Sequence, residues 1–188
     1  MEKDLEDIHW IDEVLEGKTE AYAQVVDKYK DRVFALATSM LKQREEAEEV
    51  AQDVFVKIFK ALPKFQRKAK FSTWMYRIAY NECVSRLRKQ KIHQVSVENI
   101  STKDLLPFTE ENEERQEAER RSSLLNKALL DLSQADRGLV HLYYFENLSV
   151  EDITHASGLS ASNVKTKLFR IRKKLHDVLM PQMQGELI

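Results

Sequence analysis

The chain has 188 residues, of which 43% are hydrophobic, and a formal net charge of −1, which allows one domain or two small ones with buried cores. Only four Gly and three Pro occur among abundant Ala, Leu, Glu, Lys and Arg, so we expect an all-α protein. No run of 18 apolar residues is present and the N-terminal segment is acidic, which argues against membrane insertion and an ordinary signal peptide and predicts a cytoplasmic protein.

The first part of the chain contains three predicted helices. A short helix is expected at about residues 8–15. Apolar residues recur at helical spacing from Tyr22 to Met40 and, more regularly, from Ala47 through Phe59 to Leu62. A proline follows Leu62 and ends this helix, because the residue before a proline is pushed out of helical conformation. Together these helices predict a bundle.

A basic loop at residues 64–71 follows the bundle helices, with phenylalanines on both sides of its cations. A further helix is expected to start with Ser72 or Thr73 as its N-cap and to run to about residue 89. Aromatic rings interleaved with cations suit single-stranded nucleic acid, because bases stack on the rings while Lys and Arg follow the backbone.

Packing is the alternative role for some of these aromatic residues. Trp74 and Ile78, four residues apart, favour the core, and Phe65 and Phe71 could simply anchor the loop. The charge of the segment favours nucleic acid, since eight basic residues stand against one acid between residues 65 and 91.

The sign of the charge reverses in residues 92–120. This segment is acidic, contains Pro107 and has few large apolar residues, which is typical of a flexible linker. The sequence therefore predicts two helical domains, at residues 1–91 and 121–188, joined by an acidic flexible linker.

Residues 148–175 predict two helices with a sharp joint. Ser149 is placed to N-cap the first helix, with Asp152 as its reciprocal capping-box partner. Gly158 supplies the left-handed residue that ends this helix, and Ser160 caps the next one. A helix, a short turn with Gly and a second helix form a helix-turn-helix.

The second helix of this motif, from residue 161 to about 177, has two different faces. Val164, Leu168, Ile171 and Leu175 form one apolar stripe for docking. Cations gather elsewhere on the helix, which suits the phosphates of double-stranded DNA. Because a basic helix can also be a plain solvated surface, this motif alone does not decide for DNA binding.

Catalytic and metal chemistry have little support in the sequence. The single Cys83 cannot form an internal disulfide, and its apolar neighbours favour a small buried residue. The five His are scattered without a ligand-like pairing, and no nucleophile, paired catalytic carboxylates or phosphate-binding glycine loop is visible. We expect no metal, no cofactor and no enzymatic activity.

Three stretches resemble a known family. They are residues 47–55 (AEEVAQDVF), residues 71–81 (FSTWMYRIAYN) and the helix-turn-helix that ends with residues 169–175 (FRIRKKL). Together they resemble bacterial RNA polymerase sigma factors of the extracytoplasmic-function (ECF) type, and the middle stretch is the most specific. The family usually has Glu-Ile-Ala at residues 152–154 and Gly-Thr-Val at residues 162–164; the substitutions keep polarity and helix-start chemistry, so we expect the fold to survive.

The resemblance implies two partners, core RNA polymerase and promoter DNA, and a function in transcription initiation. Residues on the polar edge of the second bundle helix correspond to the family's polymerase-binding surface: Glu48, Glu49, Gln52 and Asp53. From the residues alone, a solvated face is favoured for these four.

For the minus 10 promoter element, the resemblance implies that the basic loop captures a base flipped from the non-template strand, and it implies contacts on the following helix. The candidates are Phe65, Arg67, Lys68, Lys70, Phe71, Tyr76, Arg77, Tyr80, Asn81, Arg86 and Arg88. For the minus 35 element, the second helix of the terminal motif would enter the major groove. The candidates there are Ser162, Asn163, Lys165, Thr166, Lys167, Phe169, Arg170 and Lys173.

Family members are commonly held inactive by an anti-sigma factor, so such an antagonist is a further expected partner. Two other functions remain open from the residues. The chain could be a helix-turn-helix transcription regulator that acts without polymerase, or a module that binds single strands or RNA through its aromatic basic loop.

Overall fold

The computed structural model describes residues 2–94 and 123–184, and within these ranges it is built of helices without strands. The N-terminal half, residues 2–94, contains α1 (Glu2–Leu15), η1 (Thr19–Ala21), α2 (Tyr22–Met40), α3 (Arg44–Ala61), η2 (Leu62–Lys64) and α4 (Phe71–Gln94). The C-terminal half, residues 123–184, begins with a helical stretch at 123–130. It continues with α6 (Gln134–Val140), η3 (His141–Phe145), α7 (Val150–Ser157) and α8 (Ala161–Gln184). The predicted all-α class is confirmed.

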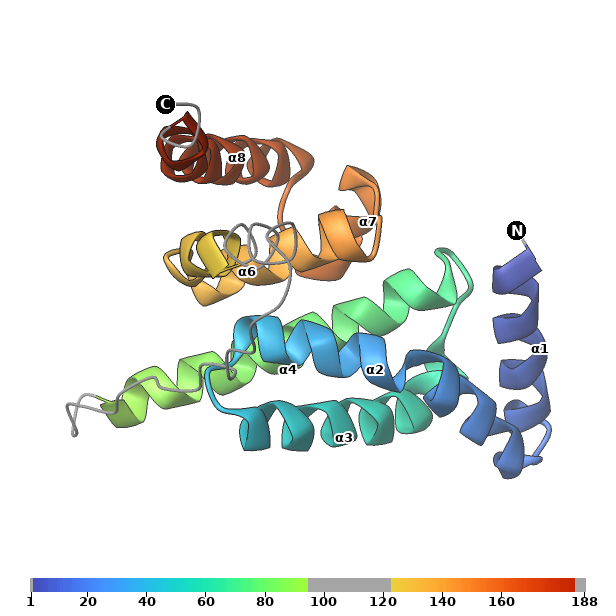
Figure 1. The fold of residues 1–188 in the computed structure, drawn as a ribbon. Coiled ribbons are helices and arrows are strands. Elements are labelled where there is room, and N and C mark those ends of the chain that lie inside the picture. The colour runs from blue at the N-terminus through green and yellow to red at the C-terminus, as the bar shows by residue number, and fades with distance from the viewer. Residues whose placement is uncertain (1, 95–122, 185–188) are drawn as a thin grey trace, which may run out of the picture.

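The helices are stacked in layers (Figure 1). In the N-terminal half, α3 lies against one side of α2 and α4, and α1 stands at the end of this group. The C-terminal half covers the other side, with α7 packed on α4 and α6 packed on α2, and α8 forms the outermost layer. As a result, α4 has protein on two sides.

The bundle helices form where the apolar spacing predicts them. The buried residues of α2 are Val25, Tyr29, Val33, Leu36, Ala37 and Met40. In α3, Glu45 and Glu46 lie in the first turn, where their negative charges interact favourably with the positive end of the helix dipole. At the other end, Pro63 lies in the 3₁₀ turn that follows the helix. Phe59 is an exception to the predicted core, because its side chain is 39% exposed.

The start of α4 differs from the prediction. The helix begins at Phe71, two or three residues before the first helical residue that was expected, and extends to Gln94. The Trp74 amide donates to the Lys70 carbonyl, so the helical bonding is already established at that point. Thr73 does not cap the helix, because its hydroxyl donates to Asp152 of the C-terminal half instead.

The helix-turn-helix is confirmed in its local chemistry. Ser149 accepts a hydrogen bond from the Asp152 amide at 3.0 Å, and the Asp152 carboxylate accepts from the Ser149 amide, which completes the capping box. Gly158 adopts φ 73°, the left-handed conformation that ends α7. Ser160 then accepts from the Asn163 amide at 3.3 Å at the start of α8.

One hydrophobic core extends through both halves. It joins N-terminal residues such as Leu36, Met40 and Tyr76 to Leu139 and Ile153 of the C-terminal half. A small second cluster of Leu132, Val140 and Ile171 lies within the C-terminal half.

The division into domains at residues 1–91, 92–120 and 121–188 stays a prediction, because most of the linker lies outside the described residues. Among the helices that the structure describes, none is both long and apolar enough to cross a membrane.

Candidate nucleic-acid interface

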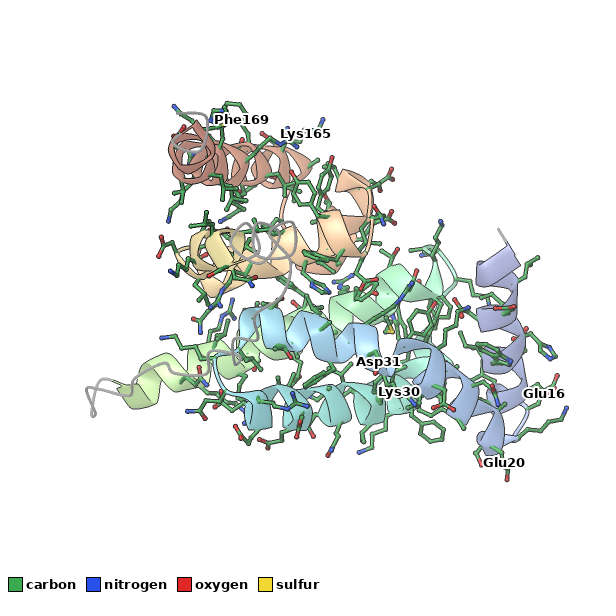
Figure 2. All side chains as sticks on the ribbon, viewed as in Figure 1. Glu16, Glu20, Lys30, Asp31, Lys165 and Phe169 are labelled. Atoms are coloured by element: carbon green, nitrogen blue, oxygen red, sulfur yellow. The ribbon has the colours of Figure 1, made fainter. Side chains whose placement is uncertain are left out.

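The outer face of α8 carries most of the residues predicted for the minus 35 element in exposed positions. Its exposed residues are Ser162, Asn163, Lys165, Thr166, Phe169, Arg170 and Lys173. Figure 2 shows Lys165 and Phe169 on the side of α8 that points away from α2 and α4. Val164, Leu168 and Ile171 are buried on the inner face, so the apolar and cationic faces predicted for this helix are confirmed.

Several cations of α8 are used within the chain. Lys167 is half-buried and forms a 2.7 Å ion pair with Asp136, which ties α8 to α6. Lys174 donates to the Asp131 carbonyl, and Arg172 donates to the Tyr144 hydroxyl. The face that remains for an anionic partner is therefore narrower than the sequence suggested.

The basic loop after η2 is anchored by aromatic packing. The ring of Phe65 lies 5.7 Å from that of Phe71 and 5.0 Å from that of Trp74. Phe71 is 2% exposed, which favours the anchoring role that the sequence left open for it. The cations Lys68 and Lys70 are exposed.

Arg67 has an unusual backbone at the tip of this loop. Its φ is 56°, which is uncommon for a residue with a side chain, and its guanidinium forms an ion pair with Asp12 of α1. This contact joins the loop to the N-terminal helix and directs the Arg67 side chain toward α1.

The candidates on α4 separate into two groups. Arg77, Asn81 and Arg88 are exposed, and Arg86 is half-buried in a 3.0 Å ion pair with Glu49. Tyr76 and Tyr80 are 1% and 5% exposed because the C-terminal half covers them. The sequence placed both tyrosines among the DNA contacts, and in this arrangement neither ring can reach a base.

Tyr76 and Tyr80 contribute directly to the seam between the halves. The Tyr76 hydroxyl donates to the Glu146 carboxylate, and the Tyr80 hydroxyl donates to the Ala135 carbonyl at 3.4 Å. Burial raises the pKa of Tyr80 to about 12. For Tyr76, burial and the hydrogen bond to Glu146 both raise the pKa, so both rings stay neutral at physiological pH.

Glu146 is the most enclosed acid at this seam. Its side chain is 7% exposed and faces Tyr76, Arg32 at 3.7 Å and His141 at 3.5 Å. Burial tends to raise the pKa of Glu146, but the neighbouring His141 ring, the hydrogen bond from Tyr76 and the charge of Arg32 outweigh it, so this pKa lies below its ordinary value. The carboxylate is therefore held in its charged form.

The acidic edge of α3 faces solvent. Glu48, Glu49, Gln52 and Asp53 are all exposed. Glu48 pairs with Arg44 one turn earlier at 2.9 Å, and the hydrogen bond and charge of Arg86 lower the pKa of Glu49. All four side chains are therefore in contact with solvent, as the residues alone favoured, and a partner protein can reach them.

Within residues 2–94 and 123–184, no three His, Cys, Asp or Glu side chains form a group that could hold a metal ion. Cys83 is 1% exposed, and burial raises its pKa to about 12. The prediction that Cys83 is a small buried residue is confirmed.

Comparison with known proteins decides the family. The Sigma-70 region 2 model matches residues 25–92, and the Sigma-70, region 4 model matches residues 122–175. The ECF RNA polymerase sigma factor SigW of Bacillus subtilis is 31% identical over 179 residues, which cover 89% of this chain and 96% of SigW. The chain belongs to the ECF sigma factors. Its function is therefore that of an RNA polymerase sigma factor in transcription initiation.

Other relatives match the sigma factor along nearly its whole length. The RNA polymerase sigma-H factor of Pseudomonas aeruginosa is 27% identical over 95% of this chain and 96% of its own. Among solved structures, CnrH in complex with the cytosolic domain of CnrY aligns with a TM-score of 0.65 at 22% identity, over 94% of this chain and 98% of CnrH. The sigma factor RpoE in complex with the anti-sigma factor NepR from Bartonella quintana gives a TM-score of 0.67 at 22% identity, over 85% and 96% of the chains. These structures support the fold.

Two surface features of the sigma factor were not predicted from its sequence. Val56 is 52% exposed beside the acidic edge of α3, and Phe59 is also partly exposed on this helix. The helical spacing from Asp53 to Val56 could have indicated a shared face. The second feature is the seam at Glu146, which has no sequence signal because Arg32 and Tyr76, the partners across the seam, lie on remote segments.

Proposed function

We propose that the sigma factor binds polymerase and the two promoter elements through three separate surfaces. The exposed edge of α3 binds core RNA polymerase, the loop after η2 together with α4 binds the opened minus 10 element, and α8 binds the minus 35 duplex. The observation that carries this proposal is the arrangement of one acidic and two cationic surfaces on three separate helices, in a chain of this family.

The polymerase-binding surface combines charge with an apolar contact. Glu48, Glu49, Gln52 and Asp53 supply an acidic rim that steers a basic partner and fixes register. The exposed side chain of Val56 lies along the same face and provides apolar area that burial in an interface would stabilise. We therefore add Val56 to the predicted set.

For the minus 10 element, single-strand capture needs both stacking surfaces and cations. Extracting a base costs a few kcal/mol, which a pocket offsets by stacking and by hydrogen bonds to the base edge. Asn81 carries the amide best suited to an edge, and Arg86 and Arg88 lie farther along α4 for phosphates. Energy for opening the promoter comes from binding, and no hydrolysis is required.

For the minus 35 element, the N-terminal part of α8 enters the major groove. Lys165, Thr166, Phe169 and Arg170 are nearest to the base edges and the adjoining backbone. Lys173 supplies phosphate attraction, which positions the helix without selecting a sequence.

An antagonist protein is part of this proposal. Among solved chains of similar fold, CnrH is in complex with the cytosolic domain of CnrY, and the sigma factor RpoE is in complex with the anti-sigma factor NepR. We infer that this chain has a protein inhibitor of the same class. We also place the sigma factor in the cytoplasm, where RNA polymerase works, and assign it no enzymatic activity.

Run-off transcription tests the proposal. Core polymerase, the sigma factor and a genomic promoter library should yield promoter-specific transcripts that are absent without the sigma factor. Replacing Asp53 and Val56 by Lys and Ser should reduce transcript yield and core binding together, whereas Glu45→Gln, an exposed change in the first turn of α3, should not.

The rival hypothesis predicts a different outcome in the same experiment. A regulator that acts without polymerase would bind a duplex site unaided and would give no transcript with core polymerase. That combination would disprove the sigma mechanism for this chain.

A further inference from the structure

A cavity of about 360 Å³ lies beside the last turn of α2. Its other walls come from the helical stretch at 123–130, from α6 and from η3, and Figure 1 shows α6 next to α2. The volume falls within the range of about 300–1,000 Å³ that is typical of small-molecule sites. None of the lining residues belongs to the three surfaces proposed for polymerase and promoter DNA.

Most of the cavity wall is apolar. Val140 is buried, whereas Leu130 and Phe145 are both 63% exposed. The Phe145 ring is nevertheless held in place, because it stacks on the His141 ring at a centroid distance of 5.3 Å. Apolar side chains that face water gain free energy when another apolar group covers them. These walls therefore favour a ligand with a hydrocarbon or aromatic body.

The turn that carries His141 and Phe145 has an uncommon conformation. Residues 141–145 form a π-helix, and the Glu146 amide donates to the His141 carbonyl five residues earlier at 3.1 Å. Such turns are rare and are frequently found at functional sites. In this one, the wide turn places the two rings nearly parallel, with 16° between their planes.

Arg137 brings a positive charge into this apolar cavity. Its Nε is buried and has no hydrogen-bond partner, and no acid among the described residues pairs with its guanidinium. Burial lowers the pKa of Arg137. The neighbouring acids are used elsewhere, since Asp136 pairs with Lys167 and Glu146 accepts from Tyr76. A buried donor without a partner is costly, so the site is suited to an anion from outside the chain.

The other polar groups of the cavity limit the kind of anion. The hydroxyls of Thr38 and Ser39 donate to the carbonyls of Phe34 and Leu36 in their own helix, at 2.8 and 2.7 Å. They are therefore not available as donors to a ligand. One guanidinium beside an apolar wall matches a single carboxylate better than a phosphate, whose three oxygens need more donors.

We propose that this cavity binds a small organic acid, with its carboxylate on Arg137 and its hydrocarbon or aromatic body against Leu130, Val140 and Phe145. The guanidinium fork can donate two parallel hydrogen bonds to one carboxylate. The ligand would touch α2 and the C-terminal half together. Because it binds only the folded chain, it would raise the thermal stability of the protein by mass action.

Calorimetric titration of the full chain tests this site with four probes at neutral pH. Octanoate and phenylbutyrate are acids, octanol is the neutral analogue, and octylamine carries the opposite charge. Arg137→Gln removes the cation, and Leu130→Ser removes apolar wall at an exposed position. Lys127→Gln is the matched control, because it removes an exposed cation of the same helical stretch that does not line the cavity. Circular dichroism checks that each variant remains folded.

We expect one saturable site per chain for both acids. Octanoate should bind roughly tenfold more tightly than octanol, as expected for a charge-assisted hydrogen bond, and octylamine should bind more weakly than either. Arg137→Gln should lower the octanoate affinity by roughly tenfold and change the octanol affinity by less than about twofold. Leu130→Ser should weaken both by a similar factor, and Lys127→Gln should resemble the wild type.

Several results would overturn the proposal. They are the absence of saturable binding for both acids, equal affinity of the wild type for octanoate and octanol, and unchanged octanoate binding in a folded Arg137→Gln. An equal loss in Lys127→Gln would also overturn it, because general charge attraction would then explain the binding. Each of these results leaves the proposed function in place, since run-off transcription judges that function separately.

Discussion

Glu146 shows how much a single side chain can contribute to the packing of the two halves on each other. Three groups face its carboxylate: Tyr76 of α4, Arg32 of α2 and His141 of η3. Only His141 belongs to the same half, so two of the three contacts are lost when the halves separate.

Acid should weaken the packing of the two halves on each other. The pKa of Glu146 and that of Asp152 lie below their ordinary values of 4.5 and 3.8, because the hydrogen bonds that each carboxylate accepts outweigh its burial. Asp152 is faced by Ser149, Thr73 and the charge of Lys70. A depressed pKa adds stability that is complete above the ordinary value and is lost as the pH falls through the depressed one.

We therefore expect nitration of Tyr76 by an acid-tolerant reagent, corrected with Tyr144, to stay constant from pH 7 to about 4.5 and to rise as the pH falls further. Glu146→Gln should flatten part of this rise. Circular dichroism serves as the control for global unfolding. A Tyr76 reactivity that stays constant while the helices remain folded would contradict the role given to these carboxylates.

Ser149 provides a test of local helix chemistry. Its hydroxyl accepts from the Asp152 amide and completes the capping box of α7. Ser149→Ala should lower the free energy of unfolding by about 1 kcal/mol, measured by denaturant titration. Ser85→Ala, at an exposed position inside α4, is the matched control and should change it by less than about half as much. Equal effects of the two changes would show that the cap does not contribute.

Sequence reasoning at the residue scale succeeded where the cause is local. The cap at Ser149 and the left-handed Gly158 depend on neighbours within a few positions, and both were predicted. The hydrogen bonds of Thr73 and Tyr76 were not predictable, because their partners Asp152 and Glu146 lie 79 and 70 residues away. A hydroxyl placed to cap a helix gives no sign in sequence that it bonds across a seam.

At the scale of elements, α8 combines docking and recognition on one helix. Its inner stripe is buried and its outer face is exposed, as the four- and three-residue spacings predicted. The engagement of Lys167 with Asp136 was not predictable, since the acid lies 31 residues earlier. The outer face is therefore built mainly from Lys165, Thr166 and Phe169, together with Arg170 and Lys173.

Two substitutions on α8 should have different effects on promoter binding. Lys173→Gln should weaken binding to all minus 35 duplexes by a similar factor and reduce the salt dependence of the affinity by about one unit of slope. Thr166→Ala, nearer the base edges, should change the ranking of promoters instead. Titration against a duplex panel at several salt concentrations measures both effects. A change of ranking with Lys173→Gln would contradict its assignment as a phosphate contact.

Helix α4 shows the limit of periodicity at this scale. A helix with one buried face has a clear apolar stripe, but α4 packs on α2 and α3 with one face and on α7 with another. Its apolar and aromatic residues are therefore spread around the axis. The sequence supported the helix and its extent to within a few residues, but it could not show which of its faces belonged to which neighbour.

At the scale of the whole molecule, the all-α class and the two matched regions could be predicted, whereas the packing of one half on the other could not. Opposite trends in charge suggested two units with separate DNA surfaces. In the structure, Leu139 and Ile153 join the same core as Leu36 and Met40. This continuity depends on residues that looked like ordinary core positions of their own halves.

The distance between the halves of the free chain tests the packing that positions its surfaces most directly. Spin labels on cysteines introduced at Lys30 of α2 and His176 of α8, both exposed, report this distance by pulsed electron resonance. Cys83 can remain, because a buried thiol whose pKa is raised to about 12 will not be labelled. We predict one narrow distance distribution for the free chain, because one hydrophobic core joins its two halves. A distribution that is broad in the free chain would contradict this packing of the two halves.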